Sequence, residues 1–397
     1  MALMHALLLI TLLSAQPALQ ELDAMCRADG GKLWGRSLCG PIVLVDPMTR
    51  SAVASDGGRV YETKIPDSMG VANTSVDWDG RRWTMVLWPL PDDAAARKRL
   101  LAHESFHRVQ QDLGFPSTGP SNAHLDSAGG RYWMRLEWLA LARAIHPSTS
   151  ARDAKRAIED ALAFRAARHA LNPDAAEEER QLEMHEGLAE YTGFALAEPR
   201  RDVRRLAIVE HVVSFQSRDS YVRSFAYASG PAWGAAVEMR KPRWTRSLKA
   251  SDDLGELARR AWRCGARFQR ASSSAAQYGG GVIRAEEDAR AEKKRQEKIA
   301  LRAKFIDGPV LTLPLGRIEL VFDPNGLQPF DEFGTVYRRI EITDVWGKIV
   351  VDGGALLTSD WKRLIVPAGG EGYTLTLNAG WRIVDDARAG DKRVETP

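Results

Sequence analysis

Short apolar runs separated by turn residues begin the chain. Residues 42–45 and 59–63 have the composition of short strands, and turn-rich segments separate them. Residues 82–88 show the strongest strand pattern, which Pro89 ends. These runs predict a small N-terminal β-sheet. The strand at 82–88 lies either at the edge of this sheet, where an extended peptide can pair with it, or in its centre.

From residue 94 the apolar positions favour helices. Asp92 and Asp93 are typical of a helix start, and Gly114-Phe115-Pro116 is typical of a stop, so the first predicted helix covers 94–113. The Pro-, Ser- and Gly-rich segment 116–130 then predicts a loop. Further helices are predicted at 132–145, 151–171, 175–196, 229–238 and 254–264.

The composition changes again after residue 280. Residues 284–304 are dense in Glu, Lys, Arg and Ala with alternating charge, which favours a solvated or partly packed linking helix over a nucleic-acid surface. From Gly308 onward, turn residues separate short strand-like runs, which predict a small β domain built as a sandwich or a partly open barrel. These runs lie at 310–313, 318–322, 338–342, 349–351, 363–366 and 373–377. We therefore expect an α+β chain with one domain at 19–280, a charged helical linker at 281–307 and a C-terminal all-β domain at 308–397.

The first eighteen residues differ from the rest. Residues 6–13 form an unbroken apolar run, and small residues around Ala15 and Ala18 follow it. This pattern is typical of a secretory signal peptide that covers residues 1–18, and the apolar run at 6–13 is too short to span a bilayer. The alternative interpretation of these residues is a frayed or buried N-terminal helix. Export predicts a secreted or periplasmic protein without stable membrane insertion, in which Cys26 and Cys39 can form a disulfide.

The composition excludes several classes of protein. At 397 residues the chain is long enough for two domains. With 44% hydrophobic and 27% charged residues, it matches soluble globular proteins rather than disordered, collagen-like or coiled-coil chains. The net charge of +3 is too small to indicate a nucleic-acid partner, and we expect none.

The first predicted helix carries the pattern His103-Glu104-Ser105-Phe106-His107. Positions four residues apart lie about 40° apart around a helix, so both imidazoles can reach one ion. A carboxylate at position 104 can take a proton from a metal-bound water and pass it to a leaving amine. Zinc is the usual metal of this pattern. The alternative is an ordinary amphipathic helix with two histidines, but the strand directly before it favours zinc.

Two histidines and one water leave a tetrahedral zinc one ligand short. The best candidate is Glu186, in the run His-Glu-Gly-Leu-Ala-Glu-Tyr at residues 185–191. We expect the small residues Gly187 and Ala189 to let this helix approach the metal helix closely. Glu190, one turn later, can hold a ligand imidazole by its second nitrogen. Solvated carboxylates in an acidic helix are the alternative.

Together, these motifs resemble the gluzincin metallopeptidases. Members of this family combine His-Glu-x-x-His with a later helix that often reads Asn-Glu-Gly-x-Ala-Glu-Tyr, and here residues 103–107 and 186–191 match. The resemblance implies a zincin-like catalytic domain, with zinc held by His103, His107 and Glu186 and with Glu104 as catalytic base. Glu186 follows the first motif at a much longer distance than in the thermolysin and aminopeptidase branches. No branch is therefore assigned, and Glu137 stays open as a rival ligand.

Tyr227 adds a third element to the resemblance. Residues 225–231, Phe-Ala-Tyr-Ala-Ser-Gly-Pro, resemble the Tyr-x-x-Gly of gluzincin aminopeptidases, in which the tyrosine stabilises the tetrahedral intermediate. A core or helix-cap position explains Tyr227 equally well, and Tyr191 is the weaker candidate for this role. His124 and Asp126 can line the rim of the cleft, although a turn cap explains Asp126 equally well.

The sequence therefore favours an exported zinc metallopeptidase that acts on peptide or protein substrates. One alternative is a zincin-like binding or scaffold protein without proteolysis, whose β domain contacts glycan or protein. The intact Glu104 speaks against it. Another alternative is a zinc hydrolase that acts on a different amide bond. The substrate preference and the partner of the β domain stay open.

Overall fold

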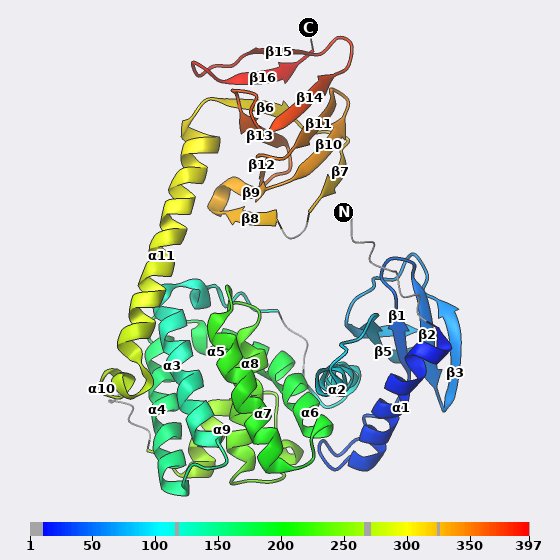
Figure 1. Cartoon of the computed structure of the whole chain (residues 1–397), viewed down its shortest axis with the longest axis vertical. Helices are drawn as coiled ribbons and strands as arrows, with labels where there is room; N and C mark the ends of the chain where they lie inside the picture. Colours follow the sequence, from blue (N-terminus) through cyan, green and yellow to red (C-terminus); the bar gives the residue numbers. More distant parts are fainter. Residues whose placement is uncertain (1–10, 116–118, 266–270, 324–325, 397) are drawn as a thin grey trace. The chain divides into compact units, whose positions relative to one another are not determined.

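The computed structural model describes residues 11–115, 119–265, 271–323 and 326–396. The chain divides into two compact units, Met1–Glu287 and Asp288–Pro397, and the division falls within the charged helix α11 (Gly280–Arg302). The predicted mixed class is confirmed, with an N-terminal sheet, a helical middle and a C-terminal all-β region (Figure 1).

The described residues of the first unit form a five-stranded sheet with the order β3-β2-β1-β5-β4. Its strands are β1 (Ile42–Val45), β2 (Ser51–Asp56), β3 (Arg59–Lys64), β4 (Thr74–Trp78) and β5 (Arg81–Leu87). β1 and β5 are parallel, and the other neighbours are antiparallel. β5 therefore lies inside the sheet, between β1 and β4. The alternative that placed this strand at the edge is wrong, because β4 forms the edge on that side.

Both faces of this sheet are covered, which explains the unbroken apolar run of β1. Ile42 and Leu44 lie in one core, whereas Val43 and Val45 lie in another on the opposite face. The first core includes Leu101 of helix α2 (Ala94–Gln110), which follows the sheet.

Helix α1 (Leu12–Asp29) packs on the same core through Ala15, Ala18, Leu19 and Leu22. The predicted signal peptide covers this helix's first turns, while residues 1–10 lie outside the described residues. Export therefore stays a prediction. A disulfide between Cys26 and Cys39 joins the end of α1 to the segment that enters β1. Among the described residues, no helix is long and apolar enough to cross a membrane.

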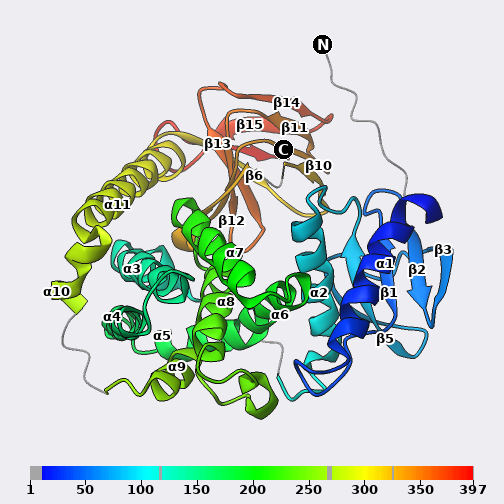
Figure 2. The same ribbon diagram turned by 60° about the horizontal axis from the view of Figure 1, so that its bottom comes forward.

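Helix α2 lies between the sheet and the helical bundle (Figures 1 and 2). Asp93 caps its start by accepting a hydrogen bond from the backbone N–H of Ala96, as its position before the helix predicts. Leu101 packs on the sheet side, whereas Phe106 and Val109 belong to the core of the bundle. The described bundle helices are α3 (Ala128–Ile145), α4 (Ala151–His169), α5 (Ala175–Leu182), α6 (Leu188–Ala197), α7 (Arg201–Ser214), α8 (Phe225–Glu238), α9 (Leu254–Trp262) and α10 (Ala271–Ala275). Two packed cores therefore fix α2 from opposite sides.

The predicted helix at 175–196 is not continuous. A π-helical turn, Glu183–Gly187, separates α5 from α6, and we refer to it as the π turn. A π turn widens the helix by one residue and changes the direction in which its side chains point. Glu186 lies within this turn, so its carboxylate leaves the face that an uninterrupted helix would give it.

The second unit contains two sheets in its described residues, one of four strands (β14-β11-β10-β7) and one of seven (β15-β16-β6-β13-β12-β9-β8). Its strands are β6 (Val310–Pro314), β7 (Glu319–Phe322), β8 (Leu327–Phe330), β9 (Gly334–Tyr337), β10 (Ile340–Asp344), β11 (Gly347–Val351), β12 (Ala355–Thr358), β13 (Arg363–Pro367), β14 (Tyr373–Leu377), β15 (Arg382–Asp385) and β16 (Lys392–Glu395). Leu313 and Leu364 of the larger sheet share one core with Ile342 and Ile349 of the smaller. Of the two predicted forms, this packing corresponds to a sandwich.

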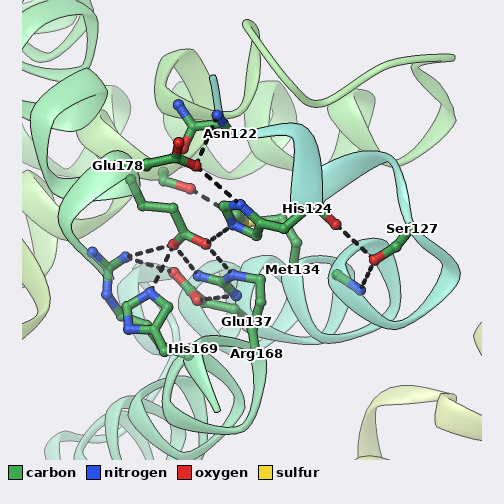
Figure 3. Close-up of polar contacts among 12 residues, drawn as sticks. Asn122, His124, Ser127, Met134, Glu137, Arg168, His169 and Glu178 are labelled. Atoms are coloured by element: carbon green, nitrogen blue, oxygen red, sulfur yellow. Dashed lines mark hydrogen bonds and ion pairs between the residues drawn. The ribbon is translucent and has the colours of Figure 1, made fainter. Parts of the chain in front are cut away.

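A buried ion-pair network holds α3, α4, α5 and the π turn together. Figure 3 shows the part of it around Glu137 and Arg168. Arg168, fully buried, donates to both carboxylate oxygens of Glu179 at 2.7 and 2.6 Å and lies 2.7 Å from Glu137 Oε2. Arg165 donates in the same way to both oxygens of Glu183, at 2.9 and 2.7 Å. Because Glu183 begins the π turn, Arg165 anchors the segment that carries Glu186.

Replacing Arg168 with Met should lower the free energy of unfolding by about 3–5 kcal/mol, because two buried carboxylates would lose their shared cation. Urea denaturation measures this change. Arg156→Met, at an exposed position of the same helix, is the control and should change stability by less than about 0.5 kcal/mol. An Arg168 variant as stable as the wild type would show that the network does not hold these helices.

Candidate metal centre

Three predicted ligands from two elements meet in the first unit. His103 Nε2 lies 3.0 Å from His107 Nε2, and Glu186 Oε2 lies 3.3 and 3.5 Å from these two nitrogens. Ligands at 2.0–2.2 Å around a tetrahedral zinc are separated by about 3.3–3.6 Å. The two distances to Glu186 fall in this range and the 3.0 Å between the imidazole nitrogens lies just below it, so the three atoms are close enough together to hold one ion. Among the described residues, the only other group with comparable spacing contains the two disulfide-bonded cysteines, whose sulfurs are already bonded to each other.

Hydrogen bonds fix which nitrogen of each imidazole faces the other. The amide Nε2 of Gln110 donates to two backbone carbonyls of the π turn, both at 3.1 Å. Its Oε1 therefore accepts the proton of His107 Nδ1, at 2.7 Å. Glu190 Oε2 accepts in the same way from His103 Nδ1, at 2.8 Å. In their neutral forms, both imidazoles consequently present Nε2 lone pairs toward Glu186.

The surroundings of these lone pairs favour a positive charge. Burial alone lowers the pKa of His103, but the Glu186 and Glu190 carboxylates outweigh burial and raise that pKa to about 10. A divalent cation satisfies the same demand and binds all three acceptor atoms at once. Two imidazoles and one carboxylate form a ligand set that zinc accepts, so the residues present fit this metal.

Glu104 lies beside the ligands with one unpartnered oxygen. Its side chain is buried, and no residue in the described part of the chain makes a hydrogen bond with its Oε2. Burial raises the pKa of this carboxyl. Glu104 and the ligands line a cleft of about 360 Å³, which also includes Asn73. A water molecule in this cleft can give its proton to Glu104.

Tyr227 reaches the same cleft from α8. Its hydroxyl donates to Glu186 Oε2 at 2.7 Å, and its ring stacks on His103 with 5.5 Å between ring centres. Burial and the charge of Glu186 raise the pKa of the phenol, so the hydroxyl keeps its proton. The structure therefore places Tyr227 within the site, in contact with a ligand.

Two glycines allow α8 to approach the π turn this closely. A Cβ on Gly230 would lie 2.2 Å from the Cα of Gly187, so only glycine fits. The expectation that Gly187 faces the metal helix is wrong, because Gly187 packs on α8. Gly193 makes the close approach to α2, where its Cβ would lie 2.9 Å from the carbonyl oxygen of Arg99. The close contact between Gly230 and Gly187 explains the Tyr-x-x-Gly spacing, because Gly230 lies one helical turn after Tyr227 and lets α8 bring Tyr227 to the cleft.

A second layer of residues supports the ligands. Glu190, which holds His103, lies 3.7 Å from His211 Nε2, and this nitrogen is 3.2 Å from the backbone oxygen of Tyr227. Burial alone raises the pKa of Glu190, but its hydrogen bond to His103 outweighs burial and lowers that pKa. The sequence reasoning missed Gln110 and His211. Gln110 could have been found, since it follows His107 by three residues and shares its helix face.

Several candidate residues lie elsewhere. Glu137 belongs to the buried network with Arg168, so its prediction as a rival ligand is wrong. The side chain of His124 is only 4% exposed and contacts Glu179 at 2.8 Å (Figure 3). His124 is not among the residues that line the cleft of the metal ligands. Tyr191 is buried and accepts a hydrogen bond from an indole nitrogen in the bundle.

Comparisons with protein-family models, with curated proteins and with solved structures found no match for this chain. Its function is therefore inferred from the geometry of the site.

Replacing Gln110 with Leu should weaken zinc binding about 10- to 100-fold, because His107 would lose the partner that orients its ring. Competition with a chromophoric chelator measures this affinity. Gln111→Leu, at the exposed neighbouring position, is the control and should bind zinc as the wild type does. Unchanged affinity in the Gln110 variant would remove this residue from the account of the site.

Proposed function

We propose that this chain is an exported zinc metallopeptidase of the gluzincin type, with a zincin-like first unit. The observation that carries the proposal is the meeting of His103, His107 and Glu186 beside the unpartnered carboxylate of Glu104. A structural zinc site usually has four protein ligands, whereas a catalytic site has three and leaves a position open for water. Three ligands beside an acid–base group favour the catalytic type.

Zinc, when bound, supplies a Lewis acid that acidifies water and polarises a carbonyl group. His103, His107 and Glu186 would hold it. Glu104 accepts the proton of the attacking water at Oε2 and then donates that proton to the leaving nitrogen. Its raised pKa favours this exchange, because the proton is held closer to neutral pH than on an exposed carboxyl.

Tyr227 supplies a hydrogen-bond donor beside the reacting carbonyl. Its protonated hydroxyl can turn from Glu186 to the oxygen on which negative charge develops. A donor placed before the reaction stabilises charge that appears only in the transition state.

The edge of the sheet offers a place for an extended substrate. In the described residues β4 pairs only with β5, and Asn73, directly before β4, lines the cleft. A peptide that adds to β4 as a further strand would run beside α2 and its histidines. This geometry favours peptide or protein substrates.

Two further parts of the proposal concern location and the second unit. The disulfide between Cys26 and Cys39 is typical of oxidising compartments, which supports a secreted or periplasmic location.

The alternative of a binding or scaffold protein without proteolysis gives no role to the unpartnered carboxylate of Glu104. The β domain needs no role in the chemistry.

Glu104→Gln should lower kcat by about 100- to 10,000-fold or more while zinc content stays at the wild-type value, because the amide cannot accept the proton. Hydrolysis of a fluorogenic peptide library measures activity, and mass spectrometry measures zinc. Glu177→Gln, at an exposed position on α5, should keep full activity. Hydrolysis at the wild-type rate by the Glu104 variant would contradict the assignment of the base.

Glu186→Ala should leave the protein folded but greatly reduce the zinc retained after dialysis, because one of three protein ligands is lost. Metal content and circular dichroism test this together. Glu177→Ala is the matched control and should retain about one zinc per chain. Full zinc retention in the Glu186 variant would assign the third ligand to another residue.

A further inference from the structure

Arg99 shares the cleft with the metal ligands. It lies on α2 four residues before His103, and the spacing of 99, 103 and 107 places all three on one helix face. Arg99 lines the same cleft as Glu104 and Tyr227. This arginine has no part in the chemistry described above.

No carboxylate pairs with Arg99 in the part of the chain that the structure describes. Its guanidinium carbon lies 4.9 Å from the ring centre of Phe194, and its charge contributes to the lowered pKa of Glu190 without a hydrogen bond or a close ion pair to that carboxylate. In contrast, Arg97 on the same helix donates to both oxygens of Glu21, at 2.9 and 3.0 Å. The five N–H donors of Arg99 are therefore available to a molecule in the cleft.

The distance between Arg99 and His103 along α2 limits which group of a bound peptide can contact Arg99. Four helical residues separate Arg99 from His103 by about 6 Å along the axis. An extended peptide advances by about 3.3 Å per residue. A group that meets Arg99 therefore lies one or two residues from the peptide bond at the ligands.

The charges that line the cleft indicate which chemical group of a substrate Arg99 can bind. Three carboxylates line it, those of Glu104, Glu186 and Glu190. A divalent cation and Arg99 together supply three positive charges, so a carboxylate on the substrate meets no net repulsion. Without Arg99 the same cleft would be negative and would repel this group.

We propose that Arg99 selects substrates that carry a carboxylate one or two residues from the cleaved bond. The carboxylate is either an Asp or Glu side chain or the C-terminus of the peptide, and the guanidinium binds both of its oxygens. This inference rests on the proposed function, because it assigns a substrate class to the same site.

The test uses the zinc-loaded full chain and matched peptides. One series carries Asp or Asn at each of the two positions on either side of the cleaved bond, with an amidated C-terminus. A second series places a free or amidated C-terminus at the same distances. We expect kcat/KM to favour the carboxylate member about 10- to 100-fold in at least one series, mainly through KM. The series that responds distinguishes a side chain from a terminus.

Arg99→Gln should bring the ratio of kcat/KM between carboxylate and neutral peptides to about one, and Arg99→Lys should restore part of it. Lys98→Gln is the matched control, because Lys98 is the neighbour of Arg99 in sequence but lines a different groove. The Lys98 variant should keep the wild-type ratio. If Arg99 only balances the charge of Glu190, Arg99→Gln will change kcat/KM by the same factor for the carboxylate peptide and for the neutral peptide of each pair. That result, or equal cleavage of both members by the wild type, would overturn the inference.

Failure of the proposed function gives a different result. If the zinc-loaded protein cleaves no peptide, the peptidase proposal fails, and calorimetric binding of the same peptides decides the role of Arg99. Tighter binding of the carboxylate member that Arg99→Gln abolishes would support the inference. Equal binding of both members, or no binding, would overturn it.

Discussion

Three electron-pair donors that face one another in a cleft need a cation between them. His103 and His107 present Nε2 lone pairs because Glu190 and Gln110 accept the protons of their other nitrogens. Glu186 adds a negative charge to the same point. The lone pairs of neutral imidazoles at this spacing repel each other, and the carboxylate is then compensated only by the hydrogen bond from Tyr227 and by no positive charge of a ligand, whereas one divalent ion satisfies all three donors. The chemistry inferred for this site depends on that requirement.

The surrounding fold keeps the donors in place. Helix α2 is held by the sheet core on one side and by the bundle core on the other. The π turn is fixed at its start by Arg165 and on its flank by the contact between Gly187 and Gly230. Buried ion pairs contribute little net stability compared with apolar packing, but they define one arrangement. Such specificity suits a site in which small displacements of a ligand weaken metal binding.

Local patterns predicted the parts of this structure that local physics determines. The strands at β1 and β5, the capped start of α2 and the ligands four residues apart all follow from short-range spacing. Helix α7 was missed because no side chain caps it and three of its apolar residues, Val203, Leu206 and Val213, are exposed, which blurs its period. β2 was missed because Ser, Ala and Asp give a weak strand pattern. The π turn, the partner of Gly187 and the position of Arg99 depend on contacts distant in sequence, which no local pattern contains.

X-ray absorption at the zinc edge of the zinc-loaded protein tests the central claim most directly. We predict about one zinc per chain with two imidazole nitrogens at about 2.0–2.1 Å, carboxylate and water oxygens at similar distances, and no sulfur. A fourth protein ligand, a sulfur ligand, or a protein that takes up no zinc would contradict the account.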